Sequence, residues 1–99
     1  MTIIINRKHQ HDSMVKYEYD HKCLEAIEFA LDGKWDAAHE IIQALYRSTW
    51  AEWIHAVLHK IEGDKSNSRY WYNRSGLNTY ESYKNPDQEL LVIKEDLFL

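Results

Sequence analysis

The feature that most constrains the fold of this chain is a pattern of residue sizes that recurs after 30 residues. Small residues occupy two positions of the pattern, a glycine stands between them, and a large residue follows. Small side chains let two helices approach closely, and glycine often ends a helix. The pattern therefore predicts two helix hairpins built on one plan. The matched pairs are Ala26 and Ala56, Gly33 and Gly63, Ala38 and Ser68, and Ile42 and Tyr72.

The composition favours helices throughout the chain. Only three glycines and one proline interrupt 99 residues, and this length suffices for one domain with a modest core. We predict an all-α fold of two stacked antiparallel helix hairpins, closed by a C-terminal capping helix. Residues 1–17 are expected to form a loosely ordered N-terminal arm with a short extended start at residues 2–5, and residues 18–99 a single helical domain. The expected helices span residues 18–31, 35–46, 49–61, 66–75 and 86–97.

Residues that favour helix ends support these boundaries. Thr49 and Glu52 have the spacing of a capping box, which predicts that Thr49 is the N-cap of its helix. Asn85 and Pro86 place a cap and a first-turn proline before the last helix. Apolar residues three or four positions apart mark the faces expected to be buried. These residues are Leu24, Ile27 and Leu31; Ala38, Ile41, Ile42 and Leu45; and Leu90, Ile93 and Leu97.

The repeated positions, with Trp35 two residues after the first glycine, resemble the tetratricopeptide repeat over residues 20–76. The period is 30 residues rather than about 34, and Lys65 stands where the second unit would carry its aromatic residue. The resemblance implies a stack of helix hairpins whose concave surface binds a peptide or another helix.

A second string runs from Trp53 to Gly76 and reads W-x-H-A-x2-H-x2-E-G-D-x2-N-x2-Y-W-Y-x-R-x-G, where x is any residue. It resembles the signature of a family of small bacterial proteins of uncharacterised function, and it covers about a quarter of the chain. The resemblance implies membership of that family and no particular activity.

Charge and cysteine content restrict the partners and the compartment. Twelve Lys and Arg against sixteen Asp and Glu give a net charge of −4, which argues against nucleic acid and anionic membranes as partners. Cys23 is the only cysteine, so no intramolecular disulfide can form, and no long apolar run predicts a membrane span. We expect a cytoplasmic protein. An acidic two-unit stack with this many aromatic residues could also form a homodimer.

Histidines and an acid offer one candidate site. His55 and His59 are four residues apart and Glu62 follows three later, so all three share one face of a helix. His39, on the preceding helix, would face them if the two helices are antiparallel. Imidazole and carboxylate suit a divalent transition metal such as zinc, and an open coordination position would permit hydrolysis. The alternative is packing, because His59 is equivalent to Phe29 in the repeat.

Aromatic residues offer the other candidate site. We expect Trp50, Trp53, Tyr70 and Trp71 to line a groove, with Arg74 as an anchor for an anionic group. No nucleophile elbow and no phosphate-binding glycine loop occurs in the chain, so no catalytic residue is assigned. The leading hypothesis is a non-catalytic interaction module that binds a protein segment or small ligand in this groove. The metal site is the rival hypothesis, and packing of all these residues in the core is a third.

Overall fold

The computed structural model describes residues 15–77 and 79–98. The predicted extended start at residues 2–5 and most of the predicted arm lie outside the described residues. Within them the chain forms five α-helices and no strand, which confirms the all-α prediction. The helices are α1 (Lys16–Leu31), α2 (Trp35–Ala44), α3 (Thr49–Glu62), α4 (Lys65–Ser75) and α5 (Pro86–Leu97).

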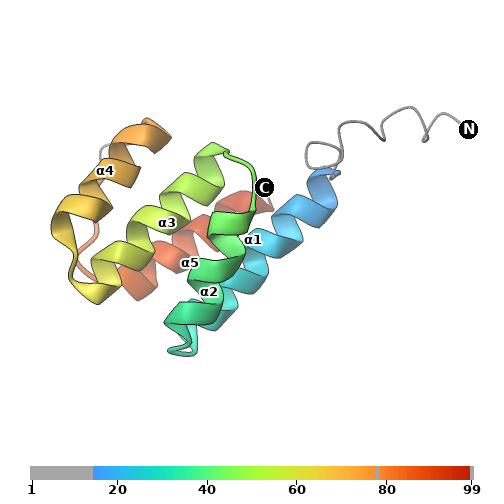
Figure 1. Cartoon of the computed structure of the whole chain (residues 1–99), viewed down its shortest axis with the longest axis horizontal. Helices are drawn as coiled ribbons and strands as arrows, with labels where there is room; N and C mark the ends of the chain where they lie inside the picture. The colour runs from blue at the N-terminus through green and yellow to red at the C-terminus, as the bar shows by residue number, and fades with distance from the viewer. Residues whose placement is uncertain (1–14, 78, 99) are drawn as a thin grey trace, which may run out of the picture.

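Short turns join the first four helices into consecutive antiparallel pairs. Helix α1 packs against α2, and α3 packs against α4 (Figure 1). Helix α3 lies in the middle of the molecule and also contacts α2, while α5 packs against both α3 and α1. Gly33 and Gly63 follow α1 and α3 with φ angles of 78° and 85°, a left-handed conformation that favours glycine.

The residue pairs of the 30-residue repeat lie in similar surroundings. Both members of each small pair are buried, and so are Ile42 and Tyr72. Ser68 shows how a polar residue is accommodated at such a position, because its hydroxyl donates a hydrogen bond of 2.7 Å to the carbonyl of Ala56. The members of each of these pairs thus share burial, one pair member in α1–α2 and the other in α3–α4. The likeness to tetratricopeptide repeats remains a resemblance.

Helix boundaries differ from the predicted ones by one or two residues in places. Helix α1 begins at Lys16 rather than at residue 18, and α4 begins at Lys65 rather than at residue 66. Helix α2 ends at Ala44 although the pattern predicted residue 46. The helix ends there because the backbone of Leu45 has a β conformation. The carbonyl of Tyr46 instead accepts a hydrogen bond of 2.7 Å from the hydroxyl of Tyr19.

The predicted capping box at the start of α3 is wrong. Ser48 is the N-cap, since its backbone is extended and its hydroxyl accepts a hydrogen bond of 3.1 Å from the amide of Ala51. Thr49 is already the first helical residue, so Glu52 does not reach back to it. The carboxylate of Glu52 therefore does not cap α3.

The core is formed by one face of each of α1, α2, α4 and α5 around α3, in which residues 51–59 are all buried. The predicted residues Ile27, Ala38, Ile42, Leu90, Ile93 and Leu97 are buried, and Leu24, Leu31, Ile41 and Leu45 are half-buried at its edge. Cys23 is fully buried as a free thiol. Among the described helices, none combines the length and the apolar character that crossing a bilayer requires.

Candidate metal centre

Three imidazole rings meet between α2 and α3. His55 and His59 lie one turn apart on α3, and their ring centroids are 4.9 Å apart. His39 comes from α2, and its Nε2 lies 3.1 Å from Nε2 of His55. One nitrogen from each ring lies within 4.8 Å of the other two. Two zinc ligands of a tetrahedral site are separated by about 3.4 Å, so the three histidines are gathered at a spacing close to that of a metal site.

Glu62 contacts one of these histidines. Nδ1 of His59 donates a hydrogen bond of 2.6 Å to Oε2 of Glu62. An imidazole that donates from Nδ1 presents the lone pair of its Nε2, and a carboxylate in this position is common behind metal-binding histidines. The sequence suggested Glu62 as a ligand beside His55 and His59. In the structure Glu62 contacts Nδ1 of His59, and His39 lies beside His55.

Two tryptophans enclose the histidines. The indole of Trp35 stacks on His39 at 4.6 Å and 11°, and its Nε1 donates a hydrogen bond of 2.6 Å to the carbonyl of Leu58. The indole of Trp71 stacks on His55 at 4.0 Å and 12°. His55 and His59 are only 7% and 6% exposed. The three rings are therefore held in place by flat apolar surfaces and shielded from most of the solvent.

Burial keeps two of the rings neutral near pH 7. It lowers the pKa of His55 to about 3, and the neighbouring His39 and His59 act in the same direction. Burial also lowers the pKa of His39, as does His59, while Glu62 and Asp36 oppose that change. Metal ions bind the neutral imidazole, so rings that resist protonation suit a metal site.

A pocket of about 210 Å³ adjoins His55 on the side of the α2–α3 turn. Trp71 and His55 form part of its wall, and Glu52, one turn before His55 on α3, is 9% exposed. Nε of Arg74 lies 3.5 Å from Oε2 of Glu52. The pocket is lined by Ile42, Gln43, Leu45, Arg47, Ala51, Glu52, His55 and Trp71.

The five residues predicted to line an aromatic groove are divided between two places. Tyr70, Trp71 and Arg74 lie together on α4, where Nη1 of Arg74 donates a hydrogen bond of 3.2 Å to the hydroxyl of Tyr70. Trp53 points into the core, since its Nε1 donates a hydrogen bond of 2.7 Å to Glu89, and Trp50 lies beside it at 6.3 Å. An indole N–H that is buried needs an acceptor, and Glu89 supplies it.

Sequence reasoning missed the buried carboxylate of Glu89. It accepts hydrogen bonds from the hydroxyl of Tyr72 at 2.7 and 2.8 Å, and Nζ of Lys60 lies 2.8 Å away. Glu89 lies in the first turn of α5, where acids are favourable without any buried partner. The missed signal is its spacing, because Glu89 precedes the buried Ile93 and Leu97 by four and eight residues and so shares their face.

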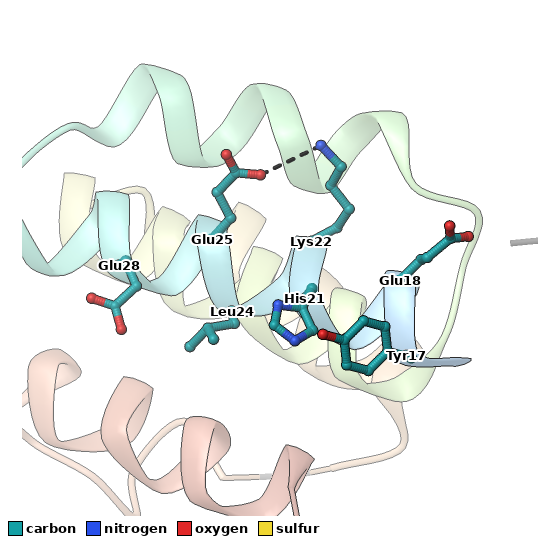
Figure 2. A pocket seen from close by; sticks show the side chains of 7 residues that line it. All are labelled: Tyr17, Glu18, His21, Lys22, Leu24, Glu25 and Glu28. Atoms are coloured by element: carbon teal, nitrogen blue, oxygen red, sulfur yellow. Dashed lines mark hydrogen bonds and ion pairs between the residues drawn. The ribbon is translucent and has the colours of Figure 1, made fainter. Parts of the chain in front are cut away.

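A larger but shallow hollow of about 610 Å³ lies elsewhere, along α1 beside α5. Figure 2 shows Leu24 and Glu28 on the side of α1 near α5, while Lys22 and Glu25 pair with each other on another side. All of its lining residues belong to α1, and it gathers no metal-binding group of the kind formed by His39, His55 and His59. Exposed apolar side chains near it would suit the predicted homodimer, which stays a prediction.

The geometry of the histidines and the adjoining pocket is thus the main chemical feature of the described residues. Comparisons of the chain with protein-family models, with curated proteins and with solved structures found no match.

Proposed function

We propose that this protein binds a divalent transition metal such as zinc through His39, His55 and His59. One observation carries the proposal: imidazoles from two helices converge, with two Nε2 atoms 3.1 Å apart and a carboxylate 2.6 Å from Nδ1 of the third ring. Three protein nitrogens leave one coordination position for water or a substrate. We also propose a cytoplasmic location, since Cys23 is a free thiol and the chain has no second cysteine to pair with it.

The chemistry of the surrounding groups supports a metal over a simple contact between histidines. A packed histidine needs only one partner for each polar nitrogen. Here His59 approaches His39 and His55, which already share a hydrogen bond. Glu62 accepts a hydrogen bond from Nδ1 of His59 and so favours the tautomer whose Nε2 can bind a metal. The stacked indoles of Trp35 and Trp71 restrict the rings of His39 and His55, so little entropy would be lost on binding.

Zinc binding to untagged protein tests this proposal. We expect calorimetry to give a single Zn²⁺ per chain, and Co²⁺ to give the visible absorption of a tetrahedral site. His39→Gln and His59→Gln should abolish tight binding, because each removes a ligand. Glu62→Gln should weaken binding about 10- to 100-fold, because it removes the group that orients His59.

The matched control is His21→Gln, since His21 is exposed on α1 and does not belong to the group of three. It should leave zinc affinity unchanged. Wild-type protein that takes up no zinc, or equal losses from His21→Gln and His39→Gln, would refute the metal site.

A second candidate function is that of the predicted interaction module, on a smaller surface formed by Tyr70, Trp71 and Arg74. Tyr70 is 51% exposed, and the guanidinium of Arg74 lies 5.8 Å from its ring and 5.6 Å from that of Trp71. An exposed ring beside a cation suits a ligand with an aromatic group and a carboxylate. Phenylacetate is the probe, and we expect it to shift the indole N–H resonance of Trp71 in wild-type protein but not in Arg74→Gln. No shift at millimolar phenylacetate would exclude this candidate.

A further inference from the structure

The pocket beside His55 extends the proposed metal centre toward the start of α3. Glu52, His55 and His59 follow one another at intervals of three and four residues, so their side chains share one face of the helix. Side chains three residues apart on a helix have Cβ atoms about 5–6 Å apart. The carboxyl group of Glu52 therefore lies in the same pocket as the ring of His55, one helical turn from the place where a metal would be held.

The carboxylate of Glu52 pairs with one cation, Arg74, and lines the pocket. Glu52 is 9% exposed, and within residues 15–77 and 79–98 its carboxylate accepts no hydrogen bond. Nε of Arg74, at 3.5 Å, is at the limit of hydrogen-bond distance. Among the described residues only Oγ1 of Thr79 is a fully buried side-chain oxygen or nitrogen without a partner, so the oxygens of Glu52 stay accessible and can accept a hydrogen bond from a donor in the pocket. A water molecule bound to a metal at the histidines is such a donor, because the metal makes its protons more acidic.

The remaining walls of the pocket indicate what else would fit beside that water. Ile42, Leu45 and Ala51 are apolar, the ring of Trp71 is flat, and Arg47 is exposed at the rim. A volume of about 210 Å³ admits a short acyl group and little more. The walls favour an uncharged substrate, since an anion would lie against Glu52.

We propose that the protein hydrolyses small uncharged carboxylic esters, with Glu52 as general base; this proposal rests on the metal site proposed above. Glu52 takes a proton from the metal-held water, and the oxygen left behind forms a bond to the acyl carbon. The bond from that carbon to the alcohol oxygen then breaks, and the proton on Glu52 passes to the departing alkoxide. The products are a carboxylic acid and an alcohol, and nothing is oxidised or reduced.

Hydrolysis of 4-nitrophenyl acetate by zinc-loaded protein tests the proposal. We expect zinc-loaded wild-type protein to exceed both the zinc-free protein and Zn²⁺ in buffer. A general base contributes about 10²- to 10⁴-fold, so Glu52→Gln should lower kcat/KM by at least about 100-fold. The zinc affinity of Glu52→Gln should equal that of wild type. The dependence of kcat/KM on pH should differ between Glu52→Gln and wild type. Glu40→Gln, which alters an exposed acid on α2, is the matched control and should keep the full rate.

Each outcome bears on one proposal. If zinc binds and Glu52→Gln keeps the wild-type rate and pH profile, the role of Glu52 is refuted while the metal site stands. If wild-type protein binds no zinc, the metal site fails first, and calorimetry reports that separately. Glu52→Asp, which keeps the carboxylate but shortens it, guards against a folding defect. It should bind zinc and recover part of the lost rate, and a rate no higher than that of Glu52→Gln would also count against a general base.

Discussion

At the residue scale, identical side chains acquire different properties from their surroundings. His21 is exposed on α1, whereas His55 is stacked on Trp71 and contacts His39. His59, on the same helix as His55, differs again because it donates a hydrogen bond to Glu62. Burial is the main cause that lowers the pKa of His55, and the neighbouring His39 and His59 act in the same direction.

Acid should destabilise the protein through His55. Its pKa is about 3 in the folded protein and about 6.5 in an unfolded chain, so the unfolded state binds more protons between these values. The free energy of unfolding should therefore fall as pH falls from about 6.5 toward 3, by up to about 4 kcal/mol from this group. Above pH 7 the protonation of His55 should not affect the free energy of unfolding. Urea denaturation at a series of pH values measures this dependence.

The control for this prediction is His55→Phe, which keeps a flat ring against Trp71 but cannot take up a proton. Its unfolding free energy should depend less on pH in the same interval. An identical pH dependence in wild type and His55→Phe would show that other groups cause the loss.

At the element scale, one buried polar group links α5 to α3 and α4 in addition to the apolar packing of α5. Glu89 is fully buried and receives hydrogen bonds from Trp53 and Lys60 of α3 and from Tyr72 of α4. A buried ion pair is a weak source of stability by itself, but removal of one partner leaves the other buried and unpaired. Glu89 and its three donors therefore support the packing of α5, in addition to the buried apolar residues Leu90, Ile93 and Leu97.

Glu89→Gln should destabilise the protein by about 3 kcal/mol, because the amide leaves Lys60 without its counter-ion and turns an N–H₂ toward other donors. Urea denaturation followed by tryptophan fluorescence measures the loss. Glu95→Gln is the control on the same helix, where the exposed side chain should change stability by less than about 0.5 kcal/mol. Equal midpoints for the two variants would contradict this account.

At the scale of the whole molecule, the proposed metal centre joins the two helix pairs. His39 belongs to α2 in the first pair, and His55 and His59 belong to α3 in the second. A ligand that binds only when these parts are packed together stabilises the folded state as a whole.

Zinc should therefore raise the melting temperature. At a free concentration of about 100 times the dissociation constant the gain is about 2.7 kcal/mol, which corresponds to about 10–20 °C for a domain of this size. Differential scanning calorimetry with and without Zn²⁺ measures the shift. His21→Gln should show the full shift and His39→Gln almost none. Zinc that binds without changing the melting temperature would argue for a site that does not join the helix pairs.

Much of the fold could be predicted from the residues themselves, and errors arose where two local signals competed. Ala26 and Ala56 are both buried, and Gly33 and Gly63 both have the left-handed conformation expected after a helix. The cap of α3 was assigned to Thr49 because Glu52 follows at the right spacing, yet Ser48, one residue earlier, is the cap. Adjacent Ser and Thr are both good caps, and the choice depends on which residue has an extended backbone.

The candidate site was less predictable. His55, His59 and Glu62 were grouped from their spacing on a single helix, and the structure brings their side chains close together. The stacking of Trp35 on His39 and the burial of Glu52 and Glu89 were not predicted from the sequence. Each of these depends on contacts between helices that are distant in sequence.

The sequence by itself determined the helices and the turns between them, because helical hydrogen bonds, caps and left-handed glycines involve residues only a few positions apart. The tertiary structure alone decided which polar side chains meet. His39 reaches His55 across 16 residues, and Trp53 reaches Glu89 across 36, only because their helices pack against each other at particular angles. Those angles arise from the fit of many side chains at once, which periodicity along the chain does not specify.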